Sequence, residues 1–353
     1  MSGSGRPNGM EPTDLSARVF QNAVGALELY TMYLGERLGY YRALADGGPL
    51  TPAELASRTG TAERYAREWL EHHAAAGLLD MAEPGRYLLP EEHIPVLADS
   101  SSLLFATSMS VELVRAARRL GDVVDAFRTG GAPPPMTWEP EGRWPSNKPV
   151  FMNLLGQQWL PAIPDVHKRL STSARVADIA CGLGWSSIAM ALAYPEITVH
   201  GLDLDAQAIE SAARSADESG VSDRVRFSAA DAATGLDGPY DLVAIIEALH
   251  DMSHPVAVLA AARKSLADGG FVLVIDERTD PEPTMPASQR EQYLYGWSVI
   301  SCLPDAMDAP DSAATGTVMR PETVRRYAAE AGFATIEMLP VGADKWSFYL
   351  LSD

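Results

Sequence analysis

Residues 175–187 read Arg175-Val176-Ala177-Asp178-Ile179-Ala180-Cys181-Gly182-Leu183-Gly184-Trp185-Ser186-Ser187. The apolar run predicts a buried strand, and the Gly-x-Gly turn leads into a helical pattern over residues 188–194. Such a turn lets backbone N–H groups face a ligand at the N-terminus of the helix. About 20 residues further on, the next apolar strand ends in Asp203, whose carboxylate can accept both hydroxyl groups of a ribose. This combination indicates a ligand that contains a nucleoside.

From Arg175 onward, apolar strand patterns alternate with helical patterns, which predicts a mostly parallel sheet with right-handed crossovers. The predicted fold class is therefore α/β, with a Rossmann-like sheet. A helix over 321–331 precedes a final hairpin around the turn Gly342-Ala343-Asp344, which forms an antiparallel edge. The predicted strands are 175–180, 197–203, 225–229, 240–246 and 270–276, with 333–341 and 345–351 in the hairpin.

Two acidic residues near the strand ends favour a ligand with positive charge. Asp178 lies just before the glycine turn, where it would repel a pyrophosphate but attract an ammonium or sulfonium group. The third strand is followed by Asp231 and Ala232, which offer the carboxylate oxygen and backbone N–H that an adenine amine and ring nitrogen require. Ribose, adenine and a cationic amino-acid end together describe S-adenosylmethionine (SAM).

These motifs, followed by Glu247-Ala248-Leu249-His250-Asp251, resemble the ordered motifs of class I SAM-dependent methyltransferases over roughly the last half of the chain. The resemblance implies a class I methyltransferase sheet with SAM as the cofactor. The family usually has glycine where this chain has Ala180, a change that slightly narrows the room beside the methionine part. The residues expected to bind SAM are Asp178, Ala180, Gly182, Gly184, Asp203, Leu204, Asp231, Ala232 and Glu247.

The N-terminal part has the pattern of a winged helix. Helical spacing over 15–45 stops at Gly47-Gly48-Pro49, and the capping box Thr51-Pro52-Ala53-Glu54 starts a helix that ends near Thr59. A second helix over 62–76 and a short hairpin over 78–89 follow. Small-molecule O-methyltransferases of the plant and antibiotic-pathway type resemble this layout, which implies a dimerisation domain and a homodimer.

Winged helices also bind DNA, so a second function has to be weighed. The second helix carries acidic and basic residues together, and this mixed charge gains little from phosphates. A net charge of −19 and a pI near 4.7 also disfavour nucleic acid and anionic membranes as partners. A DNA-binding regulator that senses SAM stays the second hypothesis, and a SAM-fold protein without a methyl acceptor is the third.

The middle of the chain is predicted to be helical. A long helix is predicted over 102–128, and a helix over 151–170 brings Trp159 towards the methionine end of the cofactor. The proline-rich segment 132–145, with two tryptophans, is either a lid or an ordered surface loop. The predicted parts are a disordered tail over 1–14, a winged-helix-like domain over 15–100, a helical linker with the candidate lid over 101–172, and the SAM-binding catalytic domain over 173–353.

The chemistry is expected just after the fourth strand of the sheet. Methyl transfer from a sulfonium is an in-line displacement, so the acceptor must be aligned and, where it is a hydroxyl, deprotonated. His250 is the candidate base because an imidazole pKa of ~6.5 suits this step at neutral pH. It matches the histidine of the Leu-His-Asp motif in the resembling O-methyltransferases, although Met252-Ser253-His254 replaces their Trp-x-Asp. Asp276 and Glu277 are the candidates for orienting it.

Each of these assignments has an alternative. His250 can instead close the strand end as a buried histidine, and Asp276 and Glu277 can be solvated carboxylates. The spacing of His250, Asp251 and His254 is compatible with a metal, but no cysteine or further histidine cluster accompanies them, so no metal is predicted. Carbon and nitrogen acceptors need the same cofactor site, so C- and N-methylation stay open.

A small organic methyl acceptor is the expected partner. The insertion between the fifth strand and the last helix is rich in aromatic and soft apolar residues, which suit a planar molecule. Core packing explains the same residues without a substrate. The residues expected to bind the acceptor are Trp159, Tyr295, Trp297 and Cys302.

The composition indicates the size of the core, the redox environment and the absence of a membrane span. A chain of 353 residues with 46% hydrophobic content can bury a sizeable core in two domains. Cys181 and Cys302 form no disulfide framework, so a reducing cytoplasm fits. The N-terminus lacks the pattern of a signal peptide, and no apolar run approaches the ~20 residues of a membrane span. We therefore expect a cytoplasmic protein without a membrane partner.

Overall fold

The computed structural model describes residues 11–134, 147–341 and 344–353. The chain forms two compact units, Met1–Arg115 and Ala116–Asp353. The segment 101–172, predicted as a linker, has residues in both units. Helix α1 begins at Pro12, within the segment 1–14 that was predicted as a tail.

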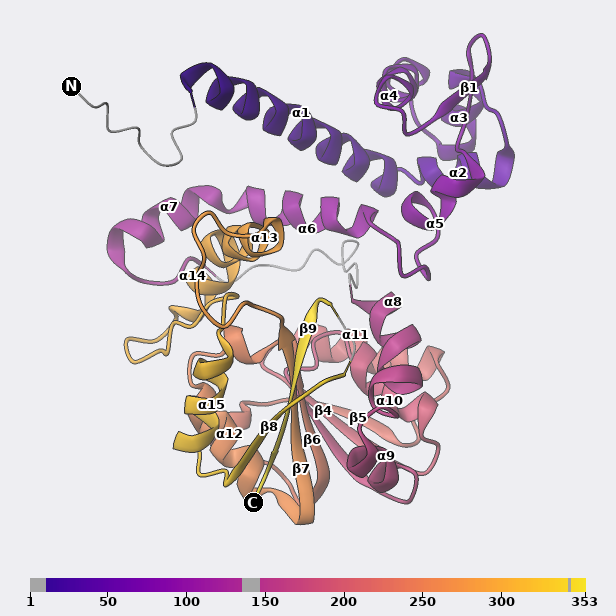
Figure 1. Cartoon of the computed structure of the whole chain (residues 1–353). Helices are drawn as coiled ribbons and strands as arrows, with labels where there is room; N and C mark the ends of the chain where they lie inside the picture. The colour runs from indigo at the N-terminus through magenta and orange to yellow at the C-terminus, as the bar shows by residue number, and fades with distance from the viewer. Residues whose placement is uncertain (1–10, 135–146, 342–343) are drawn as a thin grey trace, which may run out of the picture. The chain divides into compact units, whose positions relative to one another are not determined.

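The first unit contains the predicted helices and hairpin (Figure 1). The capping box of α3 is confirmed, because the Thr51 hydroxyl accepts the N–H of Glu54 at 3.2 Å and the Glu54 carboxylate accepts the N–H of Thr51 at 2.8 Å. Trp69 lies edge-on to Tyr40 and Tyr41 in the core of this unit. The elements are α1 (Pro12–Arg37), α2 (Tyr40–Gly47), α3 (Pro52–Thr59), α4 (Glu63–Ala75), β1 (Asp80–Glu83), β2 (Arg86–Leu88), η1 (Glu91–His93), α5 (Ile94–Leu97) and most of α6 (Thr107–Arg118).

A seven-stranded sheet in the order β5-β4-β3-β6-β7-β9-β8 forms the centre of the second unit. Strands β3 to β7 run parallel, whereas β9 pairs antiparallel with both β7 and β8. The predicted α/β sheet with an antiparallel edge hairpin is therefore confirmed. The strands are β3 (Arg175–Ile179), β4 (Thr198–Asp203), β5 (Val225–Ala229), β6 (Tyr240–Ile246), β7 (Leu266–Glu277), β8 (Thr335–Leu339) and β9 (Trp346–Ser352).

Helices cover both faces of this sheet, with α9 and α10 on one side and α12 and α15 on the other (Figure 1). Successive residues of a strand point to opposite faces of the sheet. On one face Val176 packs with Ile188 of α10, and on the other face Val243 packs with Leu259 of α12. The helices are α7 (Leu120–Thr129), α8 (Lys148–Val150), η2 (Phe151–Trp159), α9 (Pro164–Leu170), α10 (Trp185–Ala193), α11 (Ala206–Glu218), η3 (Ala232–Thr234), η4 (Leu249–Asp251), α12 (Pro255–Lys264), α13 (Gln289–Trp297), η5 (Ser298–Cys302), α14 (Leu303–Ala306) and α15 (Pro321–Glu330).

Two helix predictions were wrong in their extent. The helix predicted over 102–128 is divided into α6 and α7 at Arg119, which leaves the helical region with φ −106° and ψ 8° and pairs with Asp305. The helix predicted over 151–170 is a π-helical segment, η2, followed by a turn and by α9, which starts at Pro164. Proline is well suited to a first helical position, so it marks a new start there.

Two other predictions fall outside the described residues. Most of the proline-rich lid candidate lies in 135–146, and most of the final hairpin turn lies in 342–343. Among the residues that are described, no helix is long and apolar enough to cross a membrane.

The order of the strands determines where a ligand can bind. The chain places β4 and β5 on one side of β3 and then crosses to place β6 on the other side. Doubly wound sheets bind ligands at such a switch point, outside the carboxyl ends of the strands. The residues that follow β3, β4, β5 and β6 are those singled out from the sequence.

Gly184 offers a test of how tightly this region is packed. Its φ is 77°, and an added Cβ would lie 2.6 Å from Phe227 and 2.8 Å from Ala212, whereas Gly220 has φ 69° with nothing within 4 Å of its added Cβ. We expect both Gly184→Ala and Gly220→Ala to lose about 1–2 kcal/mol of stability to the left-handed backbone. Only Gly184→Ala should lose a further 1–3 kcal/mol, roughly, to overpacking.

Urea denaturation of both variants measures this difference in the free energy of unfolding. Equal losses in the two variants would mean that Phe227 and Ala212 move aside without cost.

Candidate functional site

The turn between β3 and α10 lies against the end of β4. The N–H of Gly182 donates to Asp203 Oδ2 at 2.8 Å, and the N–H of Cys181 donates to the carbonyl of Leu202 at 3.0 Å. Gly182 has φ 52°, which glycine adopts without strain. The glycine turn and the end of the acidic strand are therefore in direct contact.

Asp178 is buried beneath this turn, with only 1% of its surface exposed. Its Oδ2 accepts hydrogen bonds from the hydroxyls of Ser186 and Ser187, each at 2.6 Å. Burial raises the pKa of Asp178 to about 6, although the two serine hydrogen bonds lower it. Any attraction of Asp178 for a cationic ligand therefore comes from a carboxylate that two hydroxyls already hold in place.

Asp203 keeps room for further hydrogen bonds. Its two oxygens accept the N–H groups of Gly182 and Asp205 at 2.8 and 2.9 Å. A carboxylate offers about four lone-pair positions, so about two remain for a ligand. The next residue, Leu204, leaves 75% of its surface exposed, so an apolar side chain stands beside this polar strand end.

Asp231 lies at the same edge of the sheet, because it follows β5, which pairs with β4. Its Oδ1 accepts the N–H of Ala233 at 2.8 Å and so caps the short helix η3. Asp231 itself is exposed, whereas Ala232 is buried. The two strand-end carboxylates therefore follow neighbouring strands.

Two residues that follow strands have left-handed backbone conformations. Ala180 follows β3 with φ 56°, and Glu247 follows β6 with φ 53°. This conformation costs a non-glycine residue about 1–2 kcal/mol. Alanine in place of the usual glycine at residue 180 therefore strains the backbone as well as narrowing the space predicted for the methionine part of the cofactor. Such strain concentrates at functional sites.

Glu247 is held by donors that lie far away in the sequence. The indole N–H of Trp346 in β9 donates to Oε1, and the amide of Asn147 donates to Oε2 at 3.4 Å. Burial raises the pKa of Glu247, and these two hydrogen bonds lower it. Neither donor was found from the sequence, because the antiparallel pairing of β9 with β7 is what places Trp346 there.

His250 lies between two carboxylates just after β6. Its Nδ1 is 2.6 Å from Asp276 Oδ1, and its Nε2 is 3.2 Å from Asp251 Oδ1. His250 and Asp276 are both buried, with 4% and 1% exposed. Burial lowers the pKa of His250, but the charges of Asp276 and Asp251 outweigh it and raise that pKa well above its ordinary value. The structure thus brings His250 together with Asp276.

Glu277 pairs with Arg290 instead of His250. Its Oε2 accepts a hydrogen bond from Arg290 at 2.5 Å. Burial and the neighbouring Glu247 raise the pKa of Glu277 to about 7, while Arg290 lowers it. Of the two predicted orienting carboxylates, Asp276 is the one that hydrogen-bonds to His250.

The four residues predicted to contact the acceptor have different surroundings. Trp159 is 2% exposed and packs against Trp346 at a ring distance of 4.9 Å, so it belongs to the core. Tyr295 and Trp297 are half-buried on α13, and the Tyr295 hydroxyl accepts a hydrogen bond from Arg320 at 3.1 Å. Cys302 is half-buried beside His250 and Asp251. No sequence pattern indicated this contact between Cys302 and His250.

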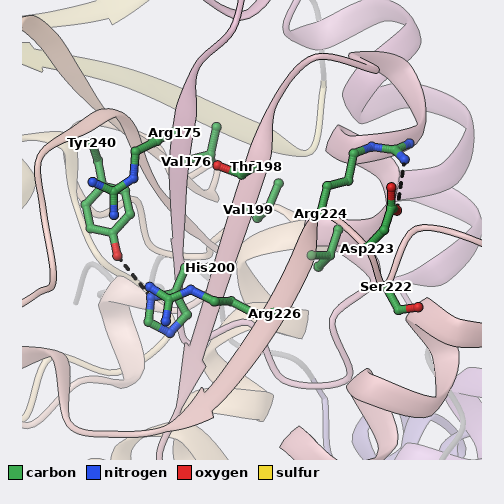
Figure 2. A pocket seen from close by; sticks show the side chains of 11 residues that line it. Arg175, Val176, Thr198, Val199, His200, Ser222, Asp223, Arg224, Arg226 and Tyr240 are labelled. Atoms are coloured by element: carbon green, nitrogen blue, oxygen red, sulfur yellow. Dashed lines mark hydrogen bonds and ion pairs between the residues drawn. The ribbon is translucent and has the colours of Figure 1, made fainter.

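A separate pocket of about 260 Å³ lies at the opposite end of the sheet (Figure 2). His200 is central to it, with Nδ1 3.0 Å from the Tyr240 hydroxyl and Nε2 2.9 Å from the Ser228 hydroxyl. The nearby arginines have protein partners, since Arg226 pairs with Asp237 at 3.0 Å. This pocket contains none of the residues predicted to bind SAM.

Two family descriptions match the chain. "Methyltransferase domain" matches residues 170–321, and "Rv2258c-like winged HTH domain" matches residues 25–99. A ubiquinone biosynthesis O-methyltransferase of Thiobacillus denitrificans is 29% identical over 203 residues, which cover 57% of this chain and 79% of that protein. A release factor glutamine methyltransferase of Chlorobaculum tepidum is 40% identical over 76 residues, or 20% of this chain and 26% of that protein.

Solved structures resemble the whole chain. Mitomycin 7-O-methyltransferase has a TM-score of 0.68 at 20% identity, covering 96% of this chain and 98% of its own. Human N-acetylserotonin methyltransferase in complex with SAM has a TM-score of 0.70 at 18% identity, covering 100% and 99%. At these identities the likeness establishes the fold. The matched domains and the curated relative show a SAM-dependent methyltransferase whose methyltransferase domain follows an N-terminal winged-helix domain in the sequence.

Proposed function

We propose that this enzyme transfers the methyl group of SAM to a hydroxyl oxygen of a small organic molecule. The observation that carries the proposal is the buried His250–Asp276 pair at the carboxyl end of β6, next to the strand that carries the cofactor turn. Relatives named as O-methyltransferases support an oxygen acceptor. C- and N-methylation are the alternatives, since a relative named for glutamine has the same kind of domain.

In this proposal, Asp276 accepts a hydrogen bond from the Nδ1–H of His250, and this leaves Nε2 unprotonated to take the proton of the acceptor. The short Nδ1 to Oδ1 distance of 2.6 Å fixes the ring and its tautomer. The carboxylates that raise the pKa of His250 also stabilise the imidazolium that forms when the proton is taken. Methyl transfer itself needs only alignment of the acceptor with the methyl group and sulfur of SAM.

The cofactor contacts are proposed from the hydrogen-bonding groups at the strand ends that remain available to a ligand. The remaining lone pairs of Asp203 accept the two ribose hydroxyls, and the exposed side chain of Leu204 packs on the adenine. The carboxylate of Asp231 and the N–H of Ala232 read the adenine edge. Asp178 and the turn from Ala180 to Gly184 face the methionine part, with Glu247 at the adjacent strand end.

The acceptor site is proposed to include Tyr295, Trp297 and Cys302. Tyr295 and Trp297 come from α13, and Cys302 ends the η5 segment that follows directly and reaches His250. Aromatic faces and a thiol provide the apolar, polarizable surface that a planar acceptor needs. Because Trp159 is buried against Trp346, we propose that it supports the Trp346–Glu247 contact from behind.

DNA binding is not favoured by the winged helix. On α4, Arg64 pairs with Glu68 at 2.5 Å and Arg67 pairs with Glu63 at 2.8 Å. These ion pairs occupy the arginines that phosphates would otherwise attract.

The cytoplasm remains the proposed compartment, since both cysteines are free thiols and a reducing environment keeps them so.

The cofactor assignment predicts large losses of affinity for S-adenosylhomocysteine in Asp203→Ala and Asp231→Ala. A hydrogen bond to a charged group contributes roughly 1.5–3 kcal/mol, so each variant should bind about 10- to 100-fold more weakly in isothermal titration. Asp237→Ala is the matched control, because it removes a carboxylate that pairs with Arg226 at the far end of the sheet. Unchanged affinity in both test variants would rule out the assignment.

The base assignment predicts that His250→Ala lowers turnover by ~10² or more while affinity for S-adenosylhomocysteine stays within about twofold. Asp276→Asn should lower turnover by at least ~10-fold because the ring loses its fixed tautomer. His254→Ala, on the exposed side of the same segment, is the control and should keep its turnover. If His250→Ala retains turnover within about threefold, the histidine serves only to close the strand end.

We also propose that the enzyme is a homodimer that uses α1. This helix carries exposed apolar residues at helical spacing over its length, and such a stripe on a 26-residue helix calls for a covering partner. A second copy of the chain is the partner that the winged-helix resemblance implies. The exposed residues are Leu15, Val19, Phe20, Val24, Leu27, Tyr30 and Leu34.

Light scattering after gel filtration tests the dimer. Wild type should have twice the chain mass of 38.0 kDa, and Phe20→Glu combined with Leu27→Glu should have the mass of one chain. Tyr65→Glu changes an apolar residue that is 79% exposed on α4 and should remain dimeric. A monomeric wild type, or a dimeric double variant, would contradict the role of α1.

A further inference from the structure

Three different kinds of metal-ligating atom converge beside the buried His250. They are a ring nitrogen of His250, a carboxylate oxygen of Asp251 and the sulfur of Cys302, and all lie within 4.8 Å of one another. The sequence suggested His254 as a partner, but that residue lies next to Asp311 instead, at 3.9 Å. The third candidate ligand is therefore the thiol of Cys302 and not the imidazole of His254.

The separation of the nitrogen and oxygen atoms matches the ligand sphere of a zinc ion, and the Cys302 sulfur lies within 4.8 Å of both. Zn–N and Zn–O bonds of ~2.0–2.2 Å in a tetrahedron place neighbouring ligand atoms roughly 3.3 Å apart. His250 Nε2 and Asp251 Oδ1 are 3.2 Å apart. A set of one nitrogen, one oxygen and one sulfur suits Zn²⁺ better than Mg²⁺ or Ca²⁺, which prefer oxygen ligands alone.

The surroundings of His250 also have the form that zinc ligands require. A metal-bound histidine usually donates its other ring N–H to a carboxylate, which fixes the tautomer. Asp276 has that position, with its Oδ1 2.6 Å from Nδ1 and its side chain buried. The Asp251 side chain is 45% exposed, so a cation can reach the site from solvent.

We propose that His250, Asp251 and Cys302 form a binding site for Zn²⁺ supported by Asp276. The three ligands leave the fourth position of a tetrahedral ion open. Zinc takes the Nε2 atom that deprotonation of the acceptor needs, so zinc inhibits methyl transfer. The inhibition rests on the proposed role of His250 as the base, whereas the metal site does not.

Binding is tested with Zn²⁺ by isothermal titration and with Co²⁺ by absorption spectroscopy of the full chain. We expect one ion per chain, with a thiolate-to-cobalt charge-transfer band in the near ultraviolet. Cys302→Ser should abolish that band and weaken zinc binding by at least ~100-fold, while Asp276→Asn should weaken it by ~10- to 100-fold. Because Cys181 is the other cysteine of the chain, Cys181→Ser must keep the band, and His254→Ala must keep the affinity.

The site is overturned if wild type binds no zinc, or if Cys302→Ser binds zinc as tightly as wild type. Inhibition is measured separately, as methyl transfer with added Zn²⁺ and after treatment with a chelator. Inhibition that the chelator reverses supports the inhibitory role. Zinc that binds through Cys302 without inhibiting contradicts that role and the assignment of His250 as base, while the metal site itself stands.

Discussion

The hydrogen bond from the Gly182 N–H to the Asp203 carboxylate joins the two loops on which the proposed cofactor site depends. It connects the turn after β3 with the end of β4, strands that are already paired along their whole length. Asp203 accepts this bond with one oxygen and the N–H of Asp205 with the other, so about two of its roughly four lone-pair positions remain for a ligand. A single side chain therefore shapes the turn and presents an acceptor for the ligand.

A second group of interactions gives the site its acidic character. His250 lies between Asp276 and Asp251, while Glu247 follows β6 and Glu277 is the last residue of the neighbouring strand β7. The charges of Asp276 and Asp251 raise the pKa of His250, and a cluster of carboxylates favours a cationic ligand such as a sulfonium. In our two proposals, the same charges support His250 as the base and also attract zinc as a competing cation.

The parts predicted from the sequence are those that local patterns determine. The capping box at Thr51 and the strand that ends in Asp203 depend on neighbouring residues, and both were confirmed. The missed features depend on residues far apart in the chain. The break at Arg119 coincides with a pair to Asp305, and Trp346 reaches Glu247 across 99 positions. No spacing rule indicates such contacts, because the packing of separate elements creates them.

A crystal structure of the enzyme with S-adenosylhomocysteine bound would show whether the strand ends hold the cofactor. We expect the ribose hydroxyls to bind Asp203, with the adenine between Leu204 and Asp231 and the sulfur facing the turn at Gly182. Density for the ligand at the amino ends of the strands, in the pocket around His200, would contradict it.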